Sequence, residues 1–276
     1  MNTFAIIGAA GYVAPKHLEA IKSIQGNVIA VTDPNDNLEV LDRYFPDCEY
    51  FKSVTDFEAF IKTKPVDFIS ICSPTYLHYQ HMQKALELGA NAICESPLVL
   101  QADELEKLID LENLTGKKVY NILQYRYHPE IIKLKESFNP KQQYNIQLVN
   151  HTYRGKWFEQ SWKGNIQKSG GILTTLGYHF FDFLIWIYGV PKNISIQTQS
   201  EHEAKGTLTL ENASIQFSFK TAAEANKFKK ERQLIVSGQT YNIDTANTNT
   251  FAALYSDIVN NKGVGISQLK KLLELA

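Results

Sequence analysis

The sequence contains little cysteine, almost no net charge and no long hydrophobic run. Its 3 cysteines, Cys48, Cys72 and Cys94, have no spacing typical of a zinc site or a disulfide framework, so no bound metal is expected. The formal net charge of -1 excludes a generally basic nucleic-acid-binding protein. Residues 180–190 are mostly apolar, but this run is shorter than the roughly 18 residues of a membrane span and contains Asp182.

What the sequence does contain is typical of a globular chain with two domains. Hydrophobic residues make up 44% of the chain and charged residues 21%, which are ordinary fractions for a folded protein. A length of 276 residues suits about two domains. The N-terminus leads directly into a strand pattern and the cysteines are expected to be reduced thiols. We therefore expect a cytoplasmic protein without a signal peptide.

The first 123 residues alternate between strand and helix patterns. Strand patterns cover 4–8, 28–32, 67–72, 91–94 and 118–123, and helix patterns lie near 14–23, 56–62, 76–88 and 102–115. Such alternation is typical of an α/β fold with a doubly wound parallel sheet and right-handed crossovers. We therefore predict a Rossmann domain over residues 1–123.

A glycine-containing turn joins the first predicted strand to the first predicted helix. Gly8 permits a tight turn, Gly11 lets the backbone approach a pyrophosphate, and Ala14 allows close packing of helix on strand. Asp33 ends the second strand about 20 residues further on, where a carboxylate binds the ribose hydroxyls of NAD and repels the extra phosphate of NADP. A purely structural turn is the alternative, but strand, turn, helix, strand and acid in this order favour NAD.

A second candidate segment for the dinucleotide follows the strand pattern at 67–72. Ser73, Pro74 and Thr75 come directly after it, before the next helix pattern. The second half of a dinucleotide crosses the ends of such strands, so these residues are expected near it. A helix cap and turn explains each side chain, taken singly, equally well.

From residue 124 onward the pattern changes. Strand patterns lie at 144–152, 193–199, 206–211, 213–219, 232–237 and 240–243, and helix patterns near 171–188, 251–260 and 266–275. Ile215, Phe217 and Phe219 alternate with polar residues, as in an antiparallel sheet with two different faces. We predict an α+β domain over 124–276 with a mainly antiparallel open sheet, and we expect a second apolar face of that sheet to pack against another subunit.

Several motifs together resemble the Gfo/Idh/MocA (glucose–fructose oxidoreductase/inositol dehydrogenase) family over nearly the whole chain. They occupy residues 8–15, 33–36, 71–78, 123–129, 154–158, 161–164, 168–171 and 177–182. The first is generic to NAD-binding folds. The Arg-Gly-x-Trp, Ser-Trp-Lys-Gly and Lys-Ser-Gly-Gly run from residue 154 is more specific. It resembles dehydrogenases that oxidise C3 of UDP-N-acetylglucosaminuronate in surface-polysaccharide (lipopolysaccharide) biosynthesis.

This resemblance implies an NAD-dependent oxidoreductase that acts on a nucleotide-sugar substrate. It implies that NAD binds Gly8, Ala9, Ala10, Gly11, Tyr12, Val13, Asp33, Ser73, Pro74, Thr75, His78, Glu95 and Gln124. It implies that the substrate binds Arg126, Tyr127, His128, Arg154, Trp157, Trp162, Lys163 and Lys168. It also implies a homodimer or homotetramer that uses 2-oxoglutarate to reoxidise NADH, and no nucleic-acid or membrane partner.

Two positions depart from the family's pattern. The family carries Glu-Lys-Pro after its fifth strand, with the lysine between nicotinamide and substrate hydroxyl, whereas here Ser96 lies between Glu95 and Pro97. Four residues before the active-site histidine, relatives commonly have Asp or Asn, whereas this chain has Thr175. We assign both positions to the predicted catalytic site. A serine donates a neutral hydrogen bond and cannot supply the charge that stabilises a developing alkoxide.

His179 is the predicted catalytic base. Oxidation of a secondary alcohol by NAD requires a group that takes the hydroxyl proton, and the unperturbed histidine pKa of about 6.5 suits this transfer near neutrality. His179 lies among apolar residues such as Phe180 and Phe181, which predicts an isolated polar group at a groove between the two domains. A satisfied core histidine is the alternative.

Basic and aromatic residues are interspersed in the segment 154–168. A solvated charged surface is the alternative for part of this run. Arg154 and Lys163 lie close in sequence to Trp157 and Trp162, which suits an anionic ligand with a flat ring, such as a nucleoside diphosphate sugar. Arg126 and His128 follow the sixth predicted strand and are expected to face the same groove. For these two residues a structural pair is an equally good interpretation.

The missing lysine leaves three consequences open. Another cation, Lys163 or Lys168, reaches the site; the enzyme is slow or has a different substrate; or the chain has lost catalysis. The predicted function is therefore an NAD-dependent sugar-nucleotide dehydrogenase. The alternatives are a family member that acts on another sugar and a non-catalytic NAD- or sugar-nucleotide-binding subunit.

Overall fold

The computed structural model describes residues 1–222, 229–244 and 248–268. The chain divides into two compact units, one comprising Met1–Ile122 and the stretch that begins at Phe251, the other Leu123–Thr250. The sequence analysis placed the stretch from Phe251 in the second domain, whereas the structure assigns it to the first unit. Of the predicted helix at 266–275, the structure describes only Ile266–Gln268, a short 3-10 turn, and the remainder lies outside the described residues.

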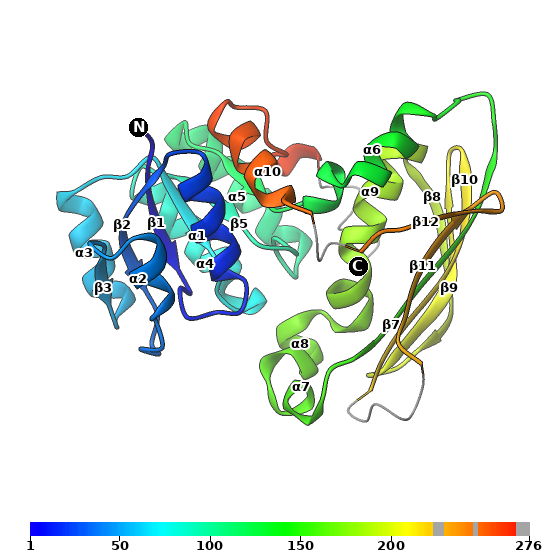
Figure 1. Cartoon of the computed structure of the whole chain (residues 1–276), viewed down its shortest axis with the longest axis horizontal. Helices are drawn as coiled ribbons and strands as arrows, with labels where there is room; N and C mark the ends of the chain where they lie inside the picture. Colours follow the sequence, from blue (N-terminus) through cyan, green and yellow to red (C-terminus); the bar gives the residue numbers. More distant parts are fainter. Residues whose placement is uncertain (223–228, 245–247, 269–276) are drawn as a thin grey trace. The chain divides into compact units, whose positions relative to one another are not determined.

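The first unit contains a six-stranded sheet whose order is β3-β2-β1-β4-β5-β6 (Figure 1). The strands are β1 Thr3–Ile7, β2 Asn27–Thr32, β3 Glu49–Phe51, β4 Phe68–Ile71, β5 Asn91–Cys94 and β6 Val119–Asn121. Every pair of neighbouring strands is parallel. Strands β1 to β3 extend the sheet toward one edge and β4 to β6 extend it toward the other, which confirms the predicted doubly wound sheet.

Local sequence signals set the helices of this unit. They are α1 Ala14–Ser23, α2 Val40–Tyr44, α3 Val54–Thr63, α4 His78–Glu87, α5 Ala102–Thr115 and α10 Thr250–Val259. Ser53 accepts a hydrogen bond from the Thr55 amide and caps α3, while Gly116 ends α5 at a φ of 69° that favours glycine. Fully buried residues such as Phe4, Ile69 and Leu18 form the core between sheet and helices.

The second unit is built on another six-stranded sheet, of order β12-β11-β7-β10-β9-β8 (Figure 1). Its strands are β7 Tyr144–Tyr153, β8 Pro191–Gln199, β9 Glu203–Leu210, β10 Ala213–Ala222, β11 Glu231–Val236 and β12 Gln239–Tyr241. Strands β7 and β10 pair in parallel, and the remaining neighbours pair antiparallel. The sheet is therefore mainly antiparallel, as predicted.

One face of this second sheet is packed on a helix and the other is largely polar. The helices are α6 Pro129–Glu136, α7 Lys156–Gln160, α8 Ile166–Ser169 and α9 Tyr178–Tyr188. Phe181 on α9 meets Phe217 and Phe219 of β10 with ring centroids 5.3 and 5.6 Å apart. Exposed Gln147 and Gln216 point the other way, because side chains alternate along a strand. The expectation of a second apolar face is therefore wrong along β7 and β10.

Among the described residues, one helical stretch, Ile166–Tyr188, is long and apolar enough to cross a membrane by length and composition. Within it, 67% of an 18-residue apolar window is buried, and the stretch is interrupted at Gly170, whose φ is 77°. Asp182 within it is also buried and forms an ion pair. These features are those of a core helix that covers a sheet, so the stretch is weak support for a membrane span.

Candidate active site

The turn after β1 has no room for side chains at its glycines. Gly8 has a φ of +86°, and a Cβ there would lie 2.6 Å from the Ser73 amide nitrogen and 2.7 Å from the Cys72 carbonyl carbon. A Cβ on Gly11 would lie 3.0 Å from the Gly8 carbonyl oxygen. The turn therefore packs directly on the carboxyl end of β4 and leaves its backbone close to any ligand that lies over it.

The start of α1 faces the same turn. Pro15 lies in its first turn, and no side chain in the described part of the protein caps its amino end. The first amide groups of a helix point outward and favour an anion. Ala9 and Ala10 are small, and Tyr12 is 88% exposed, so these residues form an open cradle that suits a pyrophosphate.

Asp33 is held over this turn at the end of β2. Its Oδ2 accepts a hydrogen bond from the Ala10 amide at 3.0 Å, and its Oδ1 accepts one from the Asn35 amide at 2.9 Å. The neighbouring Thr32 hydroxyl is buried with no hydrogen-bond partner among the described residues. The glycine turn, the helix start and this carboxylate together fit NAD, since each recognises a different part of a dinucleotide.

The segment after β4 is tied together by two histidines. The Ser73 hydroxyl lies 2.8 Å from His81 Nδ1, and burial lowers the pKa of His81 to about 4. His78 is fully buried, with Nδ1 2.7 Å from the Pro97 carbonyl and Nε2 2.9 Å from the Ser73 carbonyl. Burial lowers the pKa of His78, while both carbonyls favour its protonated form. This geometry supports a positioning role for His78 rather than direct contact with NAD.

Ser96 occupies the position at which the family pattern has lysine. Its hydroxyl donates to the Ile122 carbonyl at 2.7 Å and lies 3.2 Å from Asn121 Oδ1. The Ser96–Pro97 peptide bond is cis. A hydroxyl has a single hydrogen, and here it is directed at the protein's own backbone. Ser96 therefore offers a ligand lone pairs and no positive charge.

Sequence reasoning missed the partners of Glu95. Its Oε1 lies 2.9 Å from His17 Nε2, and His17 Nδ1 lies 2.6 Å from the hydroxyl of Tyr255, which lies 2.7 Å from Ser70 Oγ. His17, Tyr255 and Ser70 are fully buried. The one signal in the sequence was His17 itself, a histidine in the fourth position of α1. Its contacts could not be predicted, because they join residues far apart in the chain.

In the second unit, His179 lies in the first turn of α9, directly after a π-helical turn at Leu173–Gly177. Its half-buried ring packs near Tyr125 and Tyr178, with centroids 6.0 and 6.2 Å away. The Thr175 hydroxyl donates to the Gly171 carbonyl at 2.8 Å, so its hydrogen is used in a bond to the backbone four residues earlier. A π-turn of this kind is frequent at functional sites, because it re-aims the side chains that follow it.

Arg126 forms a two-pronged ion pair with Asp182. Its Nε and Nη2 donate to Oδ2 and Oδ1 at 2.9 and 2.6 Å, and its guanidinium lies 5.5 Å from the Trp186 ring. Burial raises the pKa of Asp182, although Arg126 opposes that shift. This arrangement favours the structural interpretation of Arg126 over direct substrate binding.

His128 is also engaged within its own unit. Its Nδ1 accepts from the Glu130 amide at 3.3 Å, so its Nε2 donates to the Asp244 carbonyl at 3.1 Å. The imidazole thus caps α6, which again favours a structural role. Tyr127 beside it is half-buried. Gln124 Oε1 is buried and has no hydrogen-bond partner in the described parts of the chain, so it could accept one from a ligand.

In the segment 154–168 the structure brings one of the basic residues, Lys163, against two of the aromatic ones. Lys163 Nζ lies 5.9 Å from the centre of the Trp157 ring and 5.4 Å from that of Trp162. Trp157 is 53% exposed, and Lys168 on α8 is exposed. The Arg154 amide donates to the Ala222 carbonyl and anchors the start of the segment. An ammonium between two indole rings suits an anion that carries a flat ring.

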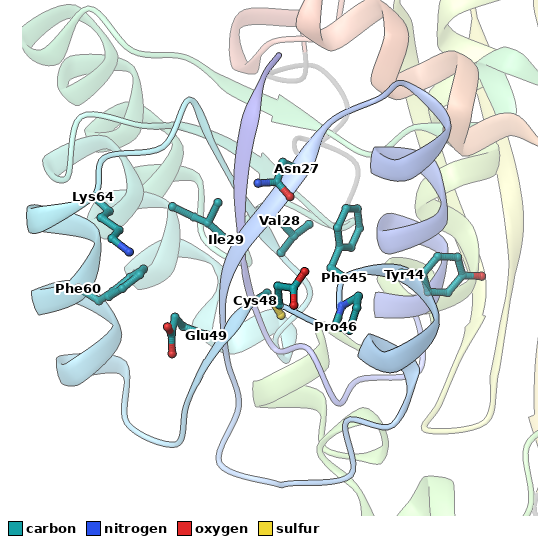
Figure 2. A pocket seen from close by; sticks show the side chains of 11 residues that line it. Asn27, Val28, Ile29, Tyr44, Phe45, Pro46, Cys48, Glu49, Phe60 and Lys64 are labelled. Atoms are coloured by element: carbon teal, nitrogen blue, oxygen red, sulfur yellow. The ribbon is translucent and has the colours of Figure 1, made fainter.

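A pocket of about 460 Å³ in the first unit is separate from the dinucleotide turn. Figure 2 shows that Asn27, Val28 and Ile29 line it, and these residues begin β2, whereas Asp33 follows the end of that strand. Cys48 also lines it, and burial raises the pKa of this thiol to about 11. Among the described residues no group of three or more His, Cys, Asp or Glu side chains could hold a metal ion.

Two family profiles match the chain, both from the Gfo/Idh/MocA group. The profile described as "Oxidoreductase family, NAD-binding Rossmann fold" matches residues 2–122. The profile described as "Oxidoreductase family, C-terminal alpha/beta domain" matches residues 142–264. Together they cover well over half of the sequence.

Solved structures resemble the whole chain. The WlbA (WbpB) dehydrogenase from Thermus thermophilus, in complex with NAD and UDP-GlcNAcA, is 34% identical, with a TM-score of 0.92 over 99% of this chain and 93% of that one. The same enzyme has been solved with NAD and alpha-ketoglutarate. The UDP-N-acetylglucosamine 3-dehydrogenase GnnA from Acidithiobacillus ferrooxidans is 17% identical, with a TM-score of 0.78 over 99% of this chain and 95% of that one, and shares the fold.

Curated relatives match over shorter stretches. An uncharacterized oxidoreductase, ORF334, from Rhizobium meliloti is 28% identical over 131 residues, which are 46% of this chain and 38% of that protein. The D-glucoside 3-dehydrogenase of Escherichia coli (strain K12) is 24% identical over 148 residues, which are 52% of this chain and 42% of that protein. The chain thus spans less than half the length of these two relatives.

Proposed function

The chain belongs to the Gfo/Idh/MocA oxidoreductase family, and we propose on that premise that it uses NAD to oxidise the C3 hydroxyl of UDP-N-acetylglucosaminuronate or a closely related UDP-N-acetylhexosamine. The observation that carries the proposal is the dinucleotide turn, where Gly8 has no room for a side chain and Asp33 is held over the Ala10 amide. The Thermus thermophilus relative supports the substrate, because its structure contains NAD and UDP-GlcNAcA.

His179 takes the hydroxyl proton in the proposed reaction. As the alcohol becomes a ketone, its carbon–hydrogen bond breaks, the hydrogen leaves with the electron pair, and the hydroxyl proton passes to the imidazole of His179. NAD, when bound, accepts the hydride. The rings of Tyr125 and Tyr178 pack near the imidazole and restrict its orientation, which supports this role.

Lys163 and its two tryptophans bind the nucleotide part of the substrate. The ammonium attracts the diphosphate, and the exposed indole of Trp157 offers a flat surface for the uracil ring. Arg154 and Lys168 add positive charge along the same segment. A carboxylate on the sugar would be a further anionic group for these cations.

The reaction is slow compared with that of a lysine-containing relative. Ser96 directs its hydrogen at the Ile122 carbonyl, so no ammonium from this position stabilises the developing alkoxide. Loss of one such preorganised donor costs about 10²–10³ in rate. The same observation favours the second candidate function, a non-catalytic subunit that binds NAD and a nucleotide sugar.

The cofactor is regenerated by 2-oxoglutarate in this proposal. The Thermus thermophilus relative supports this, since it has been solved with NAD and alpha-ketoglutarate. NAD and nucleotide sugars are cytoplasmic metabolites, and the described residues contain only unpaired thiols. We place the reaction in the cytoplasm, where a keto sugar nucleotide can serve lipopolysaccharide synthesis.

The direct test follows reduced nicotinamide by its absorbance. The purified protein is mixed with NAD and UDP-N-acetylglucosaminuronate, with and without 2-oxoglutarate, beside the Ser96→Lys variant. We expect a weak signal in the wild type that grows in the variant. Tight NAD binding with no turnover in either protein would favour the binding subunit, and no dinucleotide binding at all would overturn both functions.

A further inference from the structure

A buried chain of hydrogen bonds in the first unit leads to the carboxylate of Glu95. It runs from Ser70 on β4 through Tyr255 on α10 and His17 on α1, with donor–acceptor distances of 2.7, 2.6 and 2.9 Å. Three side chains from three different elements thus form a chain that ends at one acidic group. The proposed reaction does not use any of the three residues behind Glu95.

One arrangement of hydrogens satisfies every group with a neutral imidazole. The Ser70 hydroxyl donates to the Tyr255 oxygen, the Tyr255 hydroxyl donates to His17 Nδ1, and His17 Nε2–H donates to Glu95. The other oxygen of Glu95 accepts from the Ser96 amide at 3.3 Å. In this arrangement His17 Nε2–H and the Ser96 amide both donate to the carboxylate. These contacts suit its ionised form, because an ionised carboxylate only accepts.

Glu95 lies at the carboxyl end of the sheet. It directly follows β5, and its amide donates to the Ile71 carbonyl at the end of β4. A dinucleotide crosses these strand ends; because Asp33 at the end of β2 marks the adenosine side, the nicotinamide side falls at β4 and β5. The Glu95 side chain is 14% exposed. Burial is the largest cause that raises the pKa of the Cys72 and Cys94 thiols at the ends of β4 and β5. The charge of Glu95 raises the pKa of both thiols further.

From this geometry we propose that Glu95 is a fixed negative charge that makes the protein prefer oxidised over reduced nicotinamide dinucleotide, with His17, Tyr255 and Ser70 as its positioning residues. The oxidised ring is a cation and the reduced ring is neutral, so a carboxylate on the nicotinamide side stabilises only the oxidised form. Ser96 sharpens this effect, because a lysine there would place an opposing positive charge beside Glu95. The inference rests on the proposed use of NAD.

The closing experiment measures the dissociation constants of NAD⁺ and NADH by calorimetry on stripped protein. The Glu95→Gln variant keeps the size of the side chain and removes its charge. An opposite charge within about 4–6 Å shifts the equilibrium between the charged and neutral forms of a group by about tenfold or more. We therefore expect that NAD⁺ binds Glu95→Gln about tenfold more weakly, relative to NADH, than it binds the wild type. Glu19→Gln, an exposed position on α1, makes the same charge change and is expected to leave the ratio unaltered.

A second variant tests the hydrogen-bond chain itself. Tyr255→Phe keeps the ring that packs on Phe4 and His17 but removes the donor to His17 Nδ1. Loss of one hydrogen bond changes an equilibrium constant by about a few-fold. The ratio of NAD⁺ affinity to NADH affinity is therefore expected to fall about threefold. Thermal unfolding of each variant shows whether it is folded.

The outcomes separate this inference from the proposed function. If both dinucleotides bind and Glu95→Gln weakens them equally, the inference is overturned and the proposed function is untouched. If the ratio shifts but no sugar is oxidised, the inference stands and the dehydrogenase proposal fails. If neither dinucleotide binds the wild type, both are overturned.

Discussion

Ser96 has one hydroxyl hydrogen, and the Ile122 carbonyl receives it at 2.7 Å. In the proposed reaction, His179 takes the hydroxyl proton without a cation at position 96 to stabilise the alkoxide. Its neighbours Tyr125 and Tyr178 are aromatic, and burial raises the pKa of Tyr125. The identity of the base can therefore be tested by a single substitution.

His179→Ala is expected to lower turnover by about 10²–10⁴-fold, since that is the usual contribution of a positioned general base. The affinity for NAD should stay nearly unchanged, because the dinucleotide turn belongs to the first unit. Stopped-flow absorbance of NADH and calorimetry measure the two quantities. His202→Ala, at an exposed position in the same unit, is the control. An unaltered rate in His179→Ala would remove this residue as the base.

Asp33→Ala is expected to weaken NAD about tenfold, because a charged hydrogen bond to the ribose is lost. The difference between the affinities for NAD and NADP should become smaller, since the variant no longer repels a phosphate at that ribose. Titration with both dinucleotides measures the change. Asp36→Ala, an exposed neighbour, is the control. Equal affinities before and after the substitution would contradict the ribose role.

At the scale of elements, the β1–α1 turn depends on its glycine. Gly8→Ala places a Cβ 2.6 Å from backbone at a φ of +86°, so we expect a loss of about 3 kcal/mol or more in the free energy of unfolding. NAD binding should weaken with it. Gly116→Ala is a matched control, because its φ is also positive, at +69°, but nothing lies within 4 Å of the added Cβ. Chemical denaturation compares the two, and equal losses would show that the close approach at Gly8 is unimportant.

The Arg126–Asp182 pair links the turn at Gln124–Tyr127 to α9. Arg126→Leu leaves a buried carboxylate without its partner, so we expect a loss of about 3–5 kcal/mol. The double variant with Asp182→Leu should recover much of it. A single variant that is as stable as the wild type in urea would show that the pair contributes nothing.

The same pair predicts a direction for pH dependence. Burial raises the folded-state pKa of Asp182, so its contribution to stability is fully present below the unfolded pKa of about 3.9 and is lost as the pH rises through the folded value. In Arg126→Leu the opposing charge is gone, and the penalty should be larger near pH 7 than near pH 5. Urea denaturation at the two pH values measures it, and a pH-independent penalty would contradict the assignment to Asp182.

Elements with a clear apolar pattern could be predicted from the sequence, and elements without one or of composite structure could not. Strands β1, β2, β4 and β5 have continuous apolar runs and were found. Strand β3, Glu49–Phe51, has only three residues and no buried one, so it carries no periodic signal. The predicted helix at 171–188 merges a π-turn with α9, because apolar composition does not reveal where hydrogen bonding changes register.

The site was predictable where a motif is local in sequence and not where folding brings distant residues together. The glycine turn and Asp33 lie together, as their spacing indicated. Lys163 lies beside Trp157 and Trp162, close to it in sequence, but their role in binding the substrate stays a prediction. Tyr255 meets His17 across 238 positions of sequence, and no short motif encodes such a contact. Likewise, Arg126 and Asp182 bind each other across 56 positions. A structural role for Arg126 was one of two interpretations of the sequence, but Asp182 was not predicted as its partner.

For the molecule as a whole, we expect a homodimer or homotetramer. The outer face of the second sheet is mainly polar, with Gln147 and Gln216 beside a hollow of about 340 Å³. If two copies meet there, Gln216→Arg brings like charges together at a two-fold interface and should shift the assembly toward monomers. Lys192→Ala, elsewhere on the sheet, is the control. Sedimentation velocity measures the assembly, and a monomeric wild type would show the expectation to be wrong.

Helix α10 returns the chain to the first unit, and Tyr255 on it completes the contacts of His17. During translation, the dinucleotide-binding unit therefore lacks α10 until Phe251 and the residues after it have left the ribosome. The first unit therefore stays incomplete while the strands of the second sheet are being synthesised. Cofactor capture on the ribosome should accordingly be late, and a message truncated before codon 251 should yield a polypeptide that proteases clear.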